Sequence, residues 1–194
     1  VYELKGDPCK GYEQTIRFVT LSEDPKGSET VTDLRSVYWE NGDGTRFKFR
    51  TTQYQNDRLT ESTSGAARRP SRAHTRLRVE ISKPKQKQTT VGGTVLFPIQ
   101  HSIGILDAAR AGRRLFVSDL YDGSEKGLKV YETAAVIGDR KPPGFKTDLP
   151  KVKNADVLAS QAAWPVSLSY YPRSKGRSDA VPEYELAFLF YENG

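Results

Sequence analysis

Along most of the chain, apolar residues recur at every second position with polar residues between them, which is typical of strands with one buried and one solvated face. Residues 45–54 show the pattern clearly, because Phe47 and Phe49 share one face while the basic residues beside them occupy the other. The pattern predicts strands at residues 12–21, 30–39, 45–54, 58–64, 75–81, 88–91, 115–120, 128–137, 166–171 and 184–191. The fold class is therefore mainly all-β.

Segments rich in Gly, Pro and Asp separate these strands. The clearest turn is residues 40–44, where Asn-Gly and Asp-Gly pairs tolerate positive φ and so predict a hairpin. The polar segment 139–158 is predicted to be an extended surface connection. Strands spaced in this way indicate a large antiparallel sheet, either closed into a barrel or folded into a sandwich.

One segment has helical periodicity instead. Pro98 can occupy the first turn of a helix, and apolar residues then recur at helical spacing until Gly112. We therefore predict one short helix near residues 98–111. Because Gly104 lowers the helix propensity, this helix should depend on packing against a sheet.

Length and charge add limits to this picture. A β-rich chain of 194 residues can fold as one domain, which we predict for residues 1–194. The net charge is +6, but the basic residues gather in predicted loops at 66–72, 83–87 and 173–177, so we expect solvated charge and no nucleic-acid partner. No stretch approaches the roughly 18 apolar residues of a membrane span, so no transmembrane segment is expected.

Motifs for metal and cofactor chemistry are missing from the sequence. The chain has two histidines, His74 and His101, and neither a Cys-x-x-Cys nor a His pair at helical spacing. The glycines at 92–93 lack the spacing and the lysine of a phosphate-binding loop. We predict no cofactor and no metal. His101 lies at the predicted helix start, where a packing role is favoured over a catalytic one.

Cys9 is the single cysteine and lies in a turn, residues 6–12, between two strand-like stretches. Alone, one thiol is consistent with a reduced compartment or with a nucleophile. Its surroundings match no protease signature. From the residues alone, both interpretations, a reduced compartment and a nucleophile, stay open.

Several stretches in one order cover nearly the whole chain: residues 6–12 and 17–19, 40–44 and 46–47, 65–69, 96–101, 121–124, 164–170, and 182–184 through 191–194. Together they resemble the EipB-like family of periplasmic cell-envelope integrity proteins of alphaproteobacteria. The resemblance implies an exported protein folded as a many-stranded antiparallel β-spiral or open barrel around a cavity. It also implies a disulfide between Cys9 and a cysteine expected beyond Gly194. We expect the signal peptide to have been removed, and N- and C-terminal portions of the protein to be absent from this chain.

The resemblance further implies a non-enzymatic periplasmic protein that supports envelope integrity. Its partner would be a lipid, another envelope component or a periplasmic protein, bound through a β-lined cavity or a sheet edge. The candidates for lining the cavity are inward aromatic residues, for which plain core packing is the alternative role: Phe47, Phe49, Tyr170, Phe188 and Phe190.

Two other functions remain open at this point. One is a hydrolase or transferase acting on envelope polymers, with His101 or an acidic pair as the base; it requires a solvent-open pocket that holds His101 beside a carboxylate. The other is a protein–protein scaffold without a ligand pocket. The family offers no catalytic residues that could be transferred to this chain.

Overall fold

The structure is a computed structural model that describes residues 1–147, 155–173 and 181–193. It divides into two compact units, each built from two segments of the chain. The first unit comprises Val1–Ile99 and Tyr121–Val130, and the second comprises Gln100–Leu120 and Tyr131–Gly194. The single domain over residues 1–194 stays a prediction, and the units are described separately.

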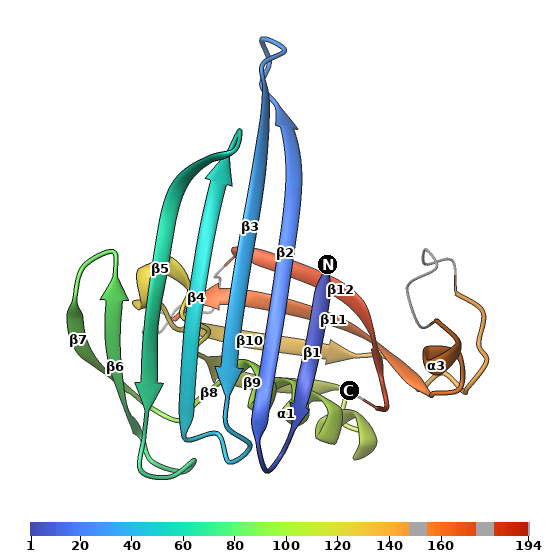
Figure 1. The fold of residues 1–194 in the computed structure, drawn as a ribbon. Helices are drawn as coiled ribbons and strands as arrows, with labels where there is room; N and C mark the ends of the chain where they lie inside the picture. The colour runs from blue at the N-terminus through green and yellow to red at the C-terminus, as the bar shows by residue number, and fades with distance from the viewer. Residues whose placement is uncertain (148–154, 174–180, 194) are drawn as a thin grey trace. The chain divides into compact units, whose positions relative to one another are not determined.

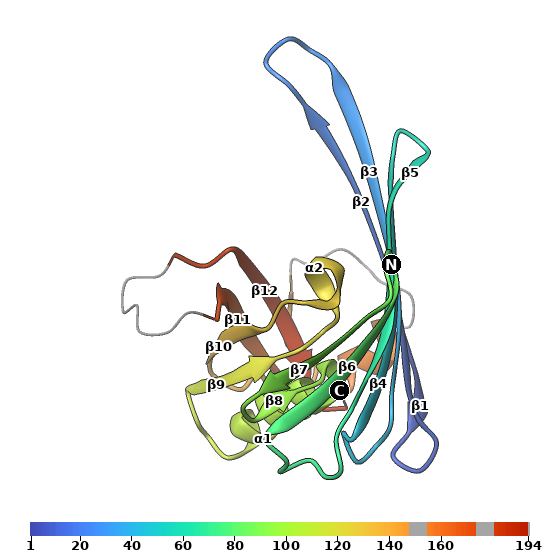
Figure 2. The same ribbon diagram turned by 90° about the vertical axis from the view of Figure 1, so that its left-hand side faces the viewer.

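The first unit contains a seven-stranded antiparallel sheet in which every strand pairs with its neighbour in sequence (Figure 1). The strands are β1 (Tyr2–Asp7), β2 (Gly11–Glu23), β3 (Glu29–Glu40), β4 (Arg46–Gln55), β5 (Arg58–Arg68), β6 (Arg76–Lys83) and β7 (Lys87–Gly92). The β2–β3 hairpin projects beyond the neighbouring strands (Figure 2). The predicted turn at residues 40–44 joins β3 to β4, where the Asn41 side-chain oxygen accepts hydrogen bonds from the backbone N–H groups of Thr45 and Arg46.

Aromatic residues dominate the core of the first unit. The rings of Phe47 and Phe97 stack with centroids 5.1 Å apart, and Tyr121 meets Phe47 and Phe49 edge-on at 6.2 and 6.1 Å. Offset and edge-on pairs of this kind contribute beyond the area that they bury. The Tyr121 hydroxyl donates to the Gly127 carbonyl oxygen at 3.0 Å, so this buried side chain is satisfied.

Two charged side chains are buried beside this core. Arg69 is 5% exposed, stacks on the Phe97 ring, and donates to the carbonyl oxygens of Gly44 and Val95. Glu40 is 1% exposed and its Oε2 accepts from the backbone N–H of Ile99 at 2.8 Å, in the first turn of the helix that follows. This contact satisfies a backbone N–H that a helix start leaves without a partner in the helix.

The second unit combines a sheet with one long helix. Four of its strands are hydrogen-bonded in the order β12-β11-β10-β9: β9 (Leu115–Leu120), β10 (Tyr131–Ile137), β11 (Ala163–Pro172) and β12 (Tyr184–Tyr191). The two-residue strand β8 (Val95–Leu96) precedes helix α1 (Pro98–Arg110), most of which belongs to this unit. The α1 residues Ile105, Leu106 and Ala109 pack in one cluster with β11 residues that include Trp164 and Val166.

The predicted packing of the helix against a sheet is confirmed at Gly104, while the dependence of its stability on this packing stays a prediction. A Cβ atom at this position would lie 2.5 Å from the Phe116 ring of β9, so the missing side chain lets strand and helix approach closely. Glycine lowers the helix propensity at this position, but its lack of a side chain is what allows this contact.

The mainly antiparallel β fold is confirmed, and in the described strands neither sheet closes on itself. The single-helix prediction needs correction, because α2 (Ser124–Gly127) and α3 (Ala155–Ala159) are also present. α2 escapes sequence patterns because Glu125 and Lys126 both have positive φ, which their side chains do not indicate. α3 falls within the predicted extended connection, part of which (148–154) lies outside the described residues. Among the described residues, no helix is long and apolar enough to cross a membrane.

Candidate functional site

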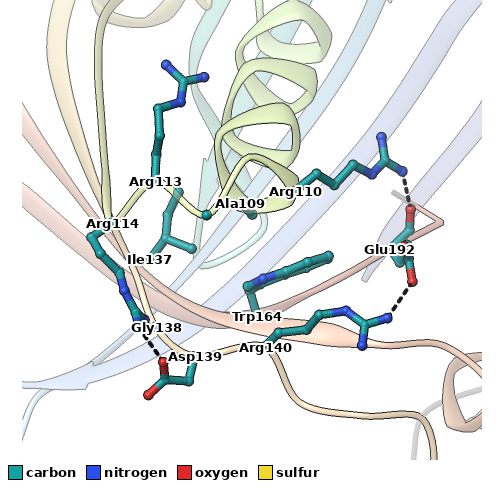
Figure 3. A pocket seen from close by; sticks show the side chains of 11 residues that line it. Ala109, Arg110, Arg113, Arg114, Ile137, Gly138, Asp139, Arg140, Trp164 and Glu192 are labelled. Atoms are coloured by element: carbon teal, nitrogen blue, oxygen red, sulfur yellow. Dashed lines mark hydrogen bonds and ion pairs between the residues drawn. The ribbon is translucent and has the colours of Figure 1, made fainter.

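The second unit contains a cavity of about 440 Å³ in which arginine is the commonest lining residue (Figure 3). Four parts of the unit contribute: the C-terminal end of α1 with the loop after it, the end of β10 with the residues after it, the start of β11, and the turn after β12. A volume of this size falls within the range of small-molecule sites. The cavity is therefore the candidate functional site.

The end of α1 places the first group of arginines. Gly112 has φ 71°, its N–H donates to the Ala109 carbonyl at 3.0 Å, and the Arg113 N–H donates to the Ala108 carbonyl at 2.9 Å. These two bonds form a Schellman motif, which ends a helix sharply with glycine in the left-handed conformation. The predicted stop at Gly112 is confirmed, and the turn brings Arg113 and Arg114 to the cavity that Arg110 also lines.

Glu192 connects two arginines from different elements (Figure 3). Its backbone carbonyl accepts a hydrogen bond from Arg110 Nη2 at 2.7 Å, and its carboxylate Oε2 lies 3.3 Å from Arg140 Nη2. The Arg140 guanidinium lies 5.8 Å from the centroid of the Trp164 ring, within the range of a cation–π contact. Trp164 is 4% exposed, so the core holds this ring rigidly in place.

The cavity carries excess positive charge. Four arginines line it, Arg110, Arg113, Arg114 and Arg140, against two carboxylates, so its formal charge is 4 − 2 = +2. The Arg114 guanidinium pairs with one of the carboxylates, Asp139, and lowers the pKa of that group. Within the described part of the chain, the Arg113 side chain has no ion-pair or hydrogen-bond partner. This arrangement suits an anionic ligand.

The acidic side chains of the cavity are two carboxylates, Asp139 and Glu192. None of its lining residues is a histidine, a cysteine or a serine. The lowered pKa of Asp139 makes that carboxylate a poor general base at neutral pH. In the described ranges, no cluster of three His, Cys, Asp or Glu side chains could hold a metal ion.

His101 lies away from this cavity in a packed environment. It is 4% exposed, its ring centroid is 5.9 Å from that of Phe116, and its Nε2 lies 2.8 Å from the Thr133 hydroxyl. The Thr133 hydroxyl donates to the Ser118 carbonyl at 2.9 Å, so it accepts from the imidazole N–H. Burial lowers the His101 pKa to about 4. The hypothesis of His101 as a base in a solvent-open pocket is therefore wrong.

The five aromatic candidates divide between the two cores. Phe47 and Phe49 are buried in the first, while Tyr170, Phe188 and Phe190 are partly buried against the second. None of them lines the arginine-rich cavity. Their role in a larger cavity stays a prediction, and core packing is the role that their contacts show.

Cys9 lies in the turn between β1 and β2, as the sequence indicated. Its thiol is exposed and free, and its backbone N–H donates to the Asp7 carboxylate at 2.8 Å. The disulfide with a cysteine beyond Gly194 stays a prediction.

Sequence reasoning missed the arginine-rich cavity. Arg113 and Arg114 adjoin the helix stop at Gly112, and Arg140 follows a predicted strand, so each had the appearance of ordinary loop charge. No spacing rule links them to Glu192. Only the grouping of three arginines within the five residues 110–114, at the end of a predicted helix, could have drawn attention to this part of the unit.

Comparisons with known proteins cover the full chain. The sequence profile described as EipB-like matches residues 1–194. The chain is 30% identical over 194 residues to the cell envelope integrity protein EipB of Brucella abortus (strain 2308), a match that covers 100% of this chain and 66% of the relative. It is also similar to the crystal structure of a β-barrel-like protein of a domain of unknown function from Brucella abortus. That match has a TM-score of 0.85 and 28% identity, and covers 100% of this chain and 76% of the other.

Proposed function

Because this chain belongs to the EipB-like family, we propose that it supports the integrity of the cell envelope by binding an envelope component in the arginine-rich cavity of its second unit. The protein acts in the periplasm as a binding protein and performs no chemistry on its ligand. The chain spans about two thirds of the length of the curated relative, whose name supplies the envelope role.

One observation carries the binding part of the proposal: four arginines from separate elements line one cavity of about 440 Å³, and one of them, Arg140, lies 5.8 Å from the centroid of the Trp164 ring. A pocket that combines an aromatic surface with a few converging charged groups is the usual form of a ligand site. The excess positive charge would attract an anionic component of the envelope.

A gene-replacement experiment tests the proposal in the organism that encodes the protein. The double variant Arg110→Ala/Arg140→Ala removes both arginines that contact Glu192, while Arg50→Ala/Arg78→Ala removes the same charge from exposed strand positions of the first unit. Plating efficiency on detergent and on a cell-wall antibiotic is measured, with protein abundance in the periplasmic fraction checked by immunoblot. We expect the cavity variant to match the gene deletion and the control to match the wild type. A cavity variant that plates like the wild type at equal abundance would refute the proposal.

A further inference from the structure

We infer that the cavity recognises a phosphomonoester, and that the Glu192 carboxylate is an internal anion that the phosphoryl group displaces from Arg140. The inference rests on the proposed function, because it names the ligand class of the same cavity. It follows from the charge of the cavity, the anchoring of Glu192 and the position of Trp164 between Arg110 and Arg140.

Charge distinguishes a phosphomonoester from a carboxylate. The cavity has a formal charge of +2 with both of its own carboxylates ionised. A phosphomonoester carries about −1.5 to −2 at pH 7 and three strong acceptor oxygens, whereas a single carboxylate carries about −1. The phosphoryl group therefore balances the cavity more closely. Arginine also suits it, because the planar guanidinium can donate two parallel hydrogen bonds to neighbouring phosphate oxygens.

Glu192 occupies the place where this group would bind. Its backbone is anchored on both sides, since its N–H donates to the Ala162 carbonyl at 2.9 Å and its carbonyl accepts from Arg110. Its carboxylate, by contrast, makes a single 3.3 Å contact with Arg140, and both side chains are about half exposed. An exposed ion pair of this kind contributes little stability. The carboxylate can thus leave Arg140 while the backbone of Glu192 stays in place.

The rest of the ligand is constrained by the cavity wall. Figure 3 shows the Trp164 ring between the side chains of Arg110 and Arg140. Ile137 and Ala109, at 2% and 6% exposed, belong with Trp164 to the packed wall of the cavity. A phosphoryl group between the two arginines would therefore lie against this wall, and the cavity volume of about 440 Å³ admits a sugar-sized ester substituent beside it.

The test measures phosphate binding by the whole protein by isothermal titration calorimetry at low salt. The soluble probes are glucose 1-phosphate and inorganic phosphate, compared with acetate and glucose. Vesicle cosedimentation with phosphatidic acid, a phosphomonoester lipid, is compared with phosphatidylglycerol, a phosphodiester. Binding of glucose 1-phosphate more tightly than inorganic phosphate, without a preference for either vesicle, would identify a free phosphomonoester as the source, and preference for phosphatidic acid vesicles would identify a lipid headgroup. Either result supports the inference.

Three variants decide whether the assigned residues act as stated. Glu192→Gln removes the competing anion and should tighten binding about two- to fivefold, the scale of one exposed ion pair. Arg140→Ala removes a charge-assisted donor and should weaken binding about tenfold or more. Arg78→Ala, on β6 of the first unit, should leave binding unchanged. Unfolding temperatures verify that each variant is folded.

Several outcomes would overturn the inference: acetate binding as tightly as phosphate, Glu192→Gln leaving affinity equal or lower, or Arg78→Ala weakening binding as much as Arg140→Ala. Failure of the proposed function can be distinguished from failure of the ligand class. If the cavity variants lose envelope protection but the wild type binds no phosphomonoester, the ligand class is wrong and the function stands. If phosphomonoester binding holds but the cavity variants protect the envelope, the function is wrong.

Discussion

Replacement of His101 should change how the stability of the protein depends on pH. In the folded protein, burial lowers the His101 pKa to about 4 from an ordinary value of 6.5. Unfolding exposes the imidazole to water and restores its ordinary pKa. Between pH 6.5 and 4 the unfolded chain therefore binds a proton that the folded protein does not, and the free energy of unfolding decreases as the pH falls.

The size of the effect follows from the two pKa values. Each pKa unit corresponds to about 1.4 kcal/mol, so the difference between 6.5 and about 4 amounts to about 3 kcal/mol. This stability is fully present above pH 6.5 and is lost progressively down to pH 4. Below pH 4 both states carry the proton, and His101 has no further influence.

Urea denaturation monitored by tryptophan fluorescence at pH 7.5, 6, 5 and 4 provides the assay. We compare the wild type with His101→Gln, whose amide can still donate to the Thr133 hydroxyl but does not titrate. The variant should be less stable at pH 7.5, and its deficit should shrink by about 3 kcal/mol by pH 4. His74→Gln, at an exposed histidine, should follow the wild-type curve. Parallel curves for wild type and His101→Gln across this range would refute the reasoning.

Two glycine substitutions make further predictions, each measured by thermal and urea unfolding. Gly112→Ala should cost about 1 to 2 kcal/mol, because alanine must adopt φ 71° at the end of α1, and Gly112→Asn should cost less; an alanine variant as stable as the wild type would contradict the Schellman assignment. Gly123→Ala should cost more, about 3 kcal/mol, because φ is 76° and the new Cβ would lie 2.4 Å from the Phe49 ring. Equal costs at Gly112 and Gly123 would show that the contact with Phe49 relaxes freely.

The sequence predicted ten of the twelve strands in the described residues, all but β1 and β8, and did so most directly where the two faces differ in environment. On β4, Phe47 and Phe49 enter the core and the basic residues beside them remain exposed, so the alternation in the sequence reports the burial directly. The predicted helix was nearly correct for a similar reason, since Pro98 and Gly112 mark its ends by backbone chemistry. The left-handed residues of α2 could not be predicted, because Glu125 and Lys126 both have positive φ, which side chains of these types rarely adopt.

The cavity was unpredictable for a different reason. Arg110, Arg140 and Glu192 come from elements that are distant in sequence, and their contacts depend on strand register rather than on any local pattern. The packing role favoured for His101 over catalysis matches its buried contacts with Phe116 and Thr133. Local sequence patterns thus identify which residues are buried. Which charged side chains from distant elements meet in a cavity can be seen only once the fold is known.

The interleaving of the two units along the chain limits how the protein can be dissected. Residues 121–130 return to the first unit and supply Tyr121 and Val130 to its core, after residues 100–120 have entered the second. A truncation after residue 99 would remove these core residues, so the excised sheet should aggregate or remain unfolded. Separate expression of either unit would need a rearranged gene, in which a short linker joins residue 99 to 121 or residue 120 to 131.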